Sequence, residues 1–153
     1  MQNTPKHPLL VVAILIALIG SITSLWAVEP ESPLAIKGYS PVSYFENDRA
    51  EKGNPEFSAT FNQRTYLFTN AEQLARFKAD PRRYEPLFPE HCPYNLTLGR
   101  QAAIDPENFK IVNGNLLLFH RDEEMDGREM WESHGDDEEL LERAKSQYTL
   151  FRF

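Results

Sequence analysis

Cys92 is the only cysteine among the 153 residues and has the most varied chemistry of any side chain in the chain. A single cysteine excludes an intramolecular disulfide, which leaves three roles open. It can be buried as a small hydrophobic side chain. It can act as a thiolate, as a nucleophile or as a metal ligand. It can also form a disulfide with a partner protein or a second copy.

His91 and His120 are the histidines that could join Cys92 in a soft site for copper or zinc. Neighbouring side chains on an extended segment point to opposite faces, so His91 and Cys92 would bind one ion only on a turn. Met125 and Met130 could complete a Cu(I) site with His120. The candidate metal ligands are therefore Cys92, His91 and His120.

The sequence motifs of common enzymes do not occur in the chain: it has no GxSxG, HExxH, CxxC or glycine-rich phosphate loop. A nucleophilic Cys92–His pair would need a third group to orient the histidine, and the sequence indicates none. These observations favour a non-catalytic protein.

The elements that must position such residues begin with a predicted hairpin. Phe57, Ala59 and Phe61 alternate with polar residues, which is the pattern of a half-buried strand. Residues 62–64 can form the turn, and residues 65–68 are rich enough in β-prone types to form the returning strand.

A helix is predicted after this hairpin, with Thr69 or Asn70 as its N-cap. It ends at residues 80–81, because the residue before a proline is disfavoured in the α conformation. Its predicted inner side carries Ala71, Leu74, Ala75 and Lys78, extended by Phe77.

Aromatic residues are concentrated in the same part of the chain. So small a domain has few other large apolar side chains, so most of these must form its core. A pocket for a small ligand between the hairpin and the helix is the alternative. The aromatic set is Tyr39, Tyr44, Phe45, Phe57, Phe61, Tyr66, Phe68, Phe77 and Tyr84. The candidate binding residues are Cys92, His91, Tyr39, Tyr66 and Tyr94.

A second hairpin is predicted over residues 109–119. Asn113-Gly114 readily supplies the two positive φ angles of a type I′ turn. Residues 110–112 and 116–119 would form its two strands.

The C-terminal part of the chain is acidic and helical. Residues 121–145 contain eleven acidic and four basic side chains, and the difference equals the whole net charge of −7. The pattern predicts one helix from about residue 136 to 148, facing the domain through Leu141, Ala144 and Tyr148. A preceding helix could be anchored by Met125, Met130 and Trp131. A solvated acidic face is the simplest interpretation, and a docking surface for a basic partner is the alternative. Nucleic acid is disfavoured as a partner because no basic surface is evident.

The N-terminal part resembles an export signal. Residues 9–27 contain no charged side chain, as in a signal peptide that could be cleaved after Ala27. The segment is also long enough for a retained membrane anchor. The predicted organisation is a signal or anchor at 1–27, a linker at 28–33, a domain at 34–120 and an acidic helical extension at 121–153 that packs on the domain.

Short motifs in order along residues 35–120 resemble the YHS domain family. The residues Tyr66-x-Phe68, Phe77, Pro81 and Tyr84 follow the order of the family's core. GYSPVSYF at residues 38–45 is similar to the GYDPVAYF opening of one branch, and residues 90–99 correspond to that branch's GGYCAYAVSLG. DPE at 105–107 and KIVNG at 110–114 continue the resemblance.

Metal-binding YHS relatives carry cysteines in DPVCG and FCSxxC segments, and here the corresponding positions are Ser43, Thr69 and Gln73. Hydroxyl and amide groups are poor replacements for thiolates. The resemblance therefore implies the scaffold and not the family's metal site, and it suggests a bacterial envelope protein.

Together these patterns predict an α+β fold: a small antiparallel β-hairpin sheet with a packed helix and acidic C-terminal helices, after an N-terminal signal or anchor helix. The predicted function is that of an exported, non-catalytic YHS-like module that binds a small ligand or a partner protein. It would be periplasmic, or held in the inner membrane by residues 9–27. The alternative is a copper, zinc or thiol-redox protein centred on Cys92.

Overall fold

A computed structural model describes residues 32–151 of the chain, so the predicted signal or anchor at residues 1–27 lies outside the described part. The elements of this part confirm the α+β class. No helix within residues 32–151 combines the length and the hydropathy needed to cross a bilayer. The elements are η1 (Ala35–Gly38), α2 (Pro41–Glu46), β1 (Asn54–Phe61), β2 (Arg64–Phe68), α3 (Ala71–Ala79), α4 (Pro81–Tyr84), α5 (Pro93–Thr97), β3 (Phe109–Val112), β4 (Asn115–Leu118), α6 (Gly127–Ser133) and α7 (Asp137–Phe151).

The first hairpin, β1–β2, confirms the prediction and begins three residues earlier than expected. Its two-residue turn has φ angles of 47° at Asn62 and 61° at Gln63, as a type I′ turn requires. The end of the predicted linker at residues 28–33 also contacts this hairpin, since the Thr65 amide donates to the Pro33 carbonyl at 2.9 Å.

Helix α3 has the predicted start, and Asn70 rather than Thr69 is its cap: the Asn70 side chain accepts a hydrogen bond from the Gln73 amide at 2.9 Å. The predicted inner side is wrong, because Ala71, Ala75 and Lys78 are exposed. The buried side instead carries Gln73 and Phe77, with Leu74 partly buried beside them. The buried Gln73 side chain is held by hydrogen bonds on this side of the helix. The prediction used hydrophobicity alone, which does not take such hydrogen bonds into account.

The second hairpin, β3–β4, also has the predicted turn, with φ angles of 49° at Asn113 and 77° at Gly114. The two hairpins do not share hydrogen bonds. They form two separate two-stranded antiparallel sheets, where the sequence had suggested one small sheet.

Strand β4 is buried on both faces. Successive side chains of a strand point to opposite faces, and Leu116, Leu117 and Leu118 are all buried. Leu116 and Leu118 belong to one hydrophobic cluster, the first core, which also contains Tyr44, Phe68 and Phe77. The aromatic residues predicted to form the core all belong to this cluster or pack against it.

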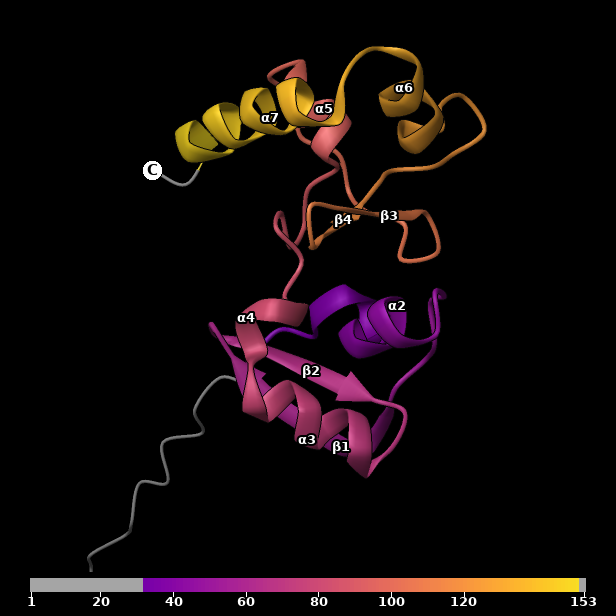
Figure 1. Cartoon of the computed structure of the whole chain (residues 1–153), viewed down its shortest axis with the longest axis vertical. Helices are drawn as coiled ribbons and strands as arrows, with labels where there is room; N and C mark the ends of the chain where they lie inside the picture. The colour runs from indigo at the N-terminus through magenta and orange to yellow at the C-terminus, as the bar shows by residue number, and fades with distance from the viewer. Residues whose placement is uncertain (1–31, 152–153) are drawn as a thin grey trace, which may run out of the picture. The chain divides into compact units, whose positions relative to one another are not determined.

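A second core contains Leu117 and Phe119 of the same strand segment, together with Trp131, Leu141 and Ala144 of the C-terminal helices. Figure 1 shows β3 and β4 between α5, α6 and α7 on one side and the β1–β2 hairpin with α2, α3 and α4 on the other. One short hairpin therefore joins two cores.

A polar clamp fastens the C-terminal helices to this hairpin. Asp137, at the start of α7, accepts hydrogen bonds from the Trp131 indole at 2.7 Å and from the Lys110 ammonium at 2.8 Å. These hydrogen bonds and the adjacent positive charge lower the pKa of Asp137, although burial opposes them. Leu141 and Ala144 are buried and Tyr148 is half-buried, which confirms the predicted inner side of α7.

We predict that Gly53→Ala destabilises the fold by about 2–3 kcal/mol, since an overpacked site forces the backbone to move. A Cβ atom at Gly53 would collide with the Leu67 Cβ and would lie 2.6 Å from the Leu67 carbonyl carbon. The measurement is urea unfolding of the purified protein, followed by the fluorescence of buried Trp131.

Gly114→Ala is the control for this prediction. Nothing lies within 4 Å of a Cβ at Gly114, where φ is 77°. The only expected penalty of Gly114→Ala is the strain of an alanine in the left-handed conformation, about 1–2 kcal/mol. A Gly53→Ala variant as stable as Gly114→Ala would contradict the close approach of the backbone at Gly53 to the backbone at Leu67.

Candidate functional site

Cys92 lies in the second core and is fully buried. It occupies the N-cap position of α5, and its amide donates to the Ala102 carbonyl at 3.0 Å. A Cβ atom at Gly127 would lie 2.9 Å from the Cys92 Sγ, so the sulfur fills the space that this glycine leaves. This environment favours the first of the three predicted roles, a small hydrophobic side chain.

The predicted metal ligands do not point to a common ion. Both ring nitrogens of His120 are engaged, Nδ1 with the Ala103 carbonyl at 2.9 Å and Nε2 with an Asp122 carboxylate oxygen at 2.8 Å. The His91 ring packs instead against Tyr148, with 5.8 Å between the ring centres. Within residues 32–151, no three side chains of the types His, Cys, Asp and Glu are grouped to hold a metal ion.

The three candidate tyrosines are separate from one another. Tyr94 is buried in the second core beside the His134 ring. Tyr39 packs at the edge of the first core and donates a hydrogen bond to Glu107 at 3.0 Å, which raises the pKa of Tyr39. Tyr66 is buried in the first core, and its hydroxyl reaches a Glu85 carboxylate oxygen at 3.4 Å.

Ser43, Thr69 and Gln73 do come together, in a buried polar cluster with Ser40. The Gln73 side-chain oxygen accepts hydrogen bonds from the Ser40 hydroxyl at 2.7 Å and from the Thr69 amide at 3.2 Å. The Ser43 hydroxyl donates to the Ser40 carbonyl at 2.8 Å and accepts from the Glu51 amide at 3.2 Å. The cluster binds α2 to α3, and its hydrogen-bonding groups are used within the protein.

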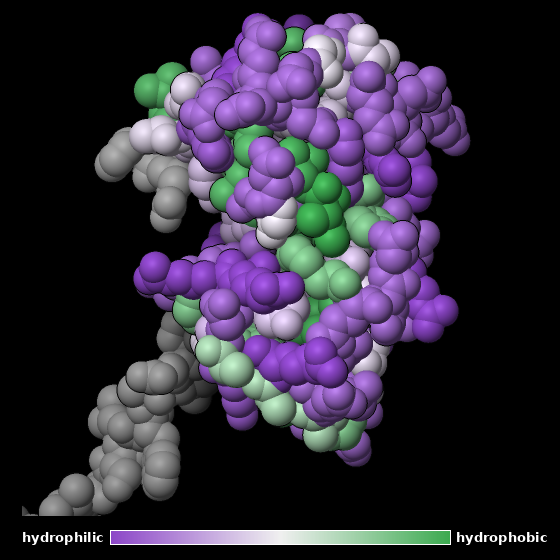
Figure 2. Space-filling view, in the orientation of Figure 1, coloured by the Kyte–Doolittle hydropathy of each residue, from purple (hydrophilic) through white to green (hydrophobic). Residues whose placement is uncertain are grey.

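A polar cleft of about 570 Å³ lies at one edge of β4, where residues 85–89 cross from the first core to the second. The Leu87 amide donates to the Leu116 carbonyl at 3.0 Å and fixes this crossing. In the space-filling view the face is mostly hydrophilic and is hollowed on its left side, between the end of α7 and α4 (Figure 2). The lining residues are Asn62, Gln63, Arg64, Arg82, Glu85, Pro86, Leu87, Pro89, Asn115 and Tyr148.

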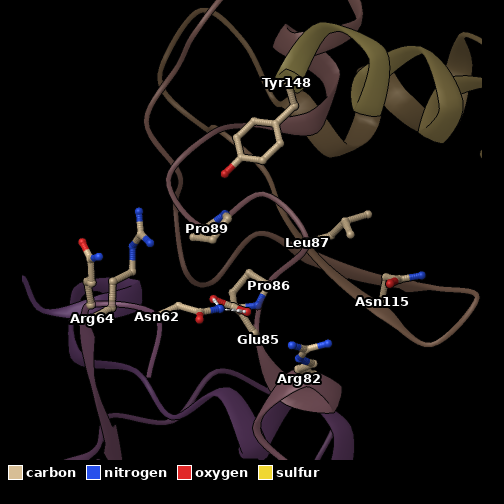
Figure 3. A pocket seen from close by; sticks show the side chains of 10 residues that line it. Asn62, Arg64, Arg82, Glu85, Pro86, Leu87, Pro89, Asn115 and Tyr148 are labelled. Atoms are coloured by element: carbon tan, nitrogen blue, oxygen red, sulfur yellow. Dashed lines mark hydrogen bonds between the residues drawn. The ribbon is translucent and has the colours of Figure 1, made fainter. Parts of the chain in front are cut away.

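Each wall of the cleft comes from a different element. The start of β2 supplies Arg64, α4 supplies Arg82, and the end of α7 supplies Tyr148. Figure 3 shows the Tyr148 hydroxyl directed toward the cleft from α7, with Arg64 and Arg82 on either side of the Glu85–Asn62 pair. Because α4 starts with proline directly after α3, Arg82 is held on a short helix close to the first core.

Among residues 32–151, Glu85 is the one carboxylate that lines the cleft, and neighbouring side chains hold it in place. Both of its oxygens accept hydrogen bonds from the Asn62 amide, at 3.1 and 2.9 Å. Tyr66 is behind it: burial, together with the Glu85 charge, raises the pKa of Tyr66, so the phenol keeps the proton that it donates. Of the residues predicted from the sequence, Tyr66 and His91 thus contact residues that line the cleft, while Cys92, Tyr94, Tyr39 and His120 lie elsewhere.

Sequence reasoning missed the residues that line the cleft. Arg82 follows a proline that ends a predicted helix, and Pro86 and Pro89 indicate irregular structure. These patterns do not show that the three residues line one cleft. Asn115 and Tyr148 reach the cleft only through tertiary packing.

Comparisons of the chain with protein-family models, with curated proteins and with solved structures found no match.

We predict that Gln73→Met destabilises the protein by about 2–4 kcal/mol, because it leaves the buried Ser40 hydroxyl and the Thr69 amide without their acceptor. In the double variant Ser40→Ala/Gln73→Met, part of this loss should be recovered, since the orphaned hydroxyl is removed. Exposed Gln101 provides the control, and Gln101→Met should change stability by less than about 0.5 kcal/mol. Equal unfolding free energies for Gln73→Met and Gln101→Met would refute the role of the cluster.

We also predict that the pKa of His120 is above its ordinary value of 6.5, chiefly through the hydrogen bond to Asp122. Its contribution to stability is then complete below about pH 6.5 and is lost as the pH rises through the folded-state pKa. Asp122→Asn keeps the oxygen that accepts from the Glu124 and Met125 amides and should lower the pKa of His120 in an NMR titration of the imidazole. The two proteins should differ most in unfolding free energy at about pH 5.5 and less at about pH 8.5; a constant difference would contradict the prediction.

Proposed function

We propose that this chain is an exported, non-catalytic binding module, built on a YHS-like scaffold, that holds a small polar ligand in the cleft at the edge of β4. The observation that carries the proposal is the cleft itself. Its volume of about 570 Å³ is in the range of small-molecule sites. Four separate parts of the chain supply its polar side chains, so the complete fold is needed to form it.

Export is proposed from residues 9–27, which lack charged side chains. Cleavage after Ala27 would release the domain into the periplasm, and retention would anchor it to the inner membrane. The YHS-like scaffold is proposed from the order of the motifs. Two of those motifs, at residues 38–45 and 105–107, do contact each other, since the Tyr44 hydroxyl donates to the Pro106 carbonyl at 2.9 Å.

A metal or thiol-redox function centred on Cys92 is the competing hypothesis. A reactive thiol needs access to solvent and a charged group that stabilises the thiolate. Cys92 is instead packed among apolar side chains of the second core and against Gly127. The burial of Cys92 supports the binding module over the thiol site.

We predict that Cys92→Ala and Cys92→Ser both keep the small molecule that the wild-type protein carries. The measurement is native mass spectrometry of the protein recovered from the compartment to which it is exported. Cys92→Ser should be the less stable variant, because an unpaired buried hydroxyl costs about 1–3 kcal/mol. Cys92→Ala avoids that penalty and keeps the experiment interpretable.

Copper or zinc that is bound to the wild type and absent from both folded Cys92 variants would overturn the proposed function. The same spectrum gives the mass of the N-terminus and therefore tests cleavage after Ala27. In the native wild-type protein the thiol should react with a chromogenic disulfide only after unfolding, and rapid reaction without unfolding would count against its structural role.

A further inference from the structure

We propose that the ligand of the cleft is a small oxyanion, a molecule with a carboxylate or phosphate group that Arg82 and Arg64 hold. This inference rests on the proposed function, because it names the class of ligand for the same cleft. It follows from the hydrogen-bonding groups that remain unused at the cleft surface.

Arg82 is the strongest argument. It is exposed at the cleft and forms no hydrogen bond or ion pair with any residue of the described part, 32–151. The other arginines of this region have partners: Arg76 binds Glu46 and Glu72, and Arg83 lies over the Tyr84 ring. A guanidinium with five free N–H donors matches the geometry of a carboxylate or phosphate, which it can bind through two parallel hydrogen bonds.

Arg64 is the second cation, and its existing partner binds it weakly. Its guanidinium reaches one Glu90 carboxylate oxygen through two nitrogens, at 3.3 and 3.4 Å, and the Arg64 and Glu90 side chains are 25% and 59% exposed. Exposed pairs of this kind contribute about 0–1 kcal/mol. Both contacts are long, so the Arg64 guanidinium can exchange Glu90 for a ligand anion in the cleft.

A neutral side chain of the cleft can also donate hydrogen bonds to an anion. The Gln63 side chain has no hydrogen-bond partner within residues 32–151, so its amide N–H groups are available. The Glu85 oxygens, in contrast, face Asn62 and Tyr66. Arg64 is paired with Glu90, so Arg82 is the guanidinium of the lining that has no carboxylate partner within residues 32–151. An anion that approaches this protein finds an excess of hydrogen-bond donors here.

The test uses two matched pairs of probes with the exported protein. Glycerol 3-phosphate is compared with glycerol, which lacks the phosphate group, and succinate with succinamide, which is neutral at nearly the same size. Amide chemical shifts in NMR spectra report both the affinity and the residues affected. We expect the anion of at least one pair to shift residues 62–64, 82–87 and 115, and its neutral counterpart to leave them unchanged. The pair that responds distinguishes a phosphate ligand from a carboxylate ligand.

Arg82→Gln and Arg83→Gln are the matched variants, because the two residues are neighbours on α4 and only Arg82 lines the cleft. Arg82→Gln should weaken binding of the anion by about tenfold or more, as expected for the loss of a charged hydrogen bond. Arg83→Gln should change it by less than about twofold. The affinity should also fall with added salt, because the cleft is open to solvent.

Equal losses in the two variants would mean that the anion senses only the general charge of α4, and would overturn the inference. Shifts of the cleft residues with glycerol or succinamide alone would also overturn it, while leaving the binding module intact. Binding that is insensitive to Arg82 and is abolished in both Cys92 variants would contradict the proposed function as well. The two proposals therefore fail by different results.

Discussion

The burial of β4 on both faces is the constraint on which the rest of the structure depends. Four consecutive apolar residues, 116–119, are fully or almost fully buried. Alternate members contribute to different cores. Each buried leucine or phenylalanine side chain contributes about 1.5–3 kcal/mol. A two-stranded hairpin is at best marginally stable by itself in water, so β3–β4 persists because elements cover both of its faces.

This arrangement explains why the acidic C-terminal helices belong to the folded domain. Their charged faces are solvated, but Trp131, Leu140 and Leu141 cover the face of β4 that the first core leaves open. Without them, Leu117 and Phe119 would be exposed to water. The clamp at Asp137 then sets the position of α7, and with it the position of the Tyr148 wall of the cleft.

The sequence predicts local features well and tertiary ones poorly. Both hairpins, the Asn113-Gly114 turn, the Asn70 cap and the aromatic core follow from interactions between residues close in the chain or from simple periodicity. The inner side of α3 does not, because Gln73 is buried by hydrogen bonds to residues distant in sequence. The unbroken apolar run at 116–119 does indicate burial on both faces, whereas nothing local indicates which residues cover them. The cleft was not predictable for the same reason, since its walls meet only after both cores have formed.

In this protein, the residues whose side chains have the most varied chemistry are not the residues whose hydrogen-bonding groups are unpaired. Three residues with versatile side chains have structural roles: Cys92, His120 and Gln73. The Cys92 thiol is buried, both imidazole nitrogens of His120 are hydrogen-bonded, and the Gln73 amide oxygen accepts from two donors. Arg82 is an ordinary residue by type, and within residues 32–151 its side-chain donors have no partner. A ligand gains the most binding free energy from groups that the fold has not already paired, because a paired group must first break a hydrogen bond. For this reason we propose the cleft, and not the cysteine, as the place where another molecule binds.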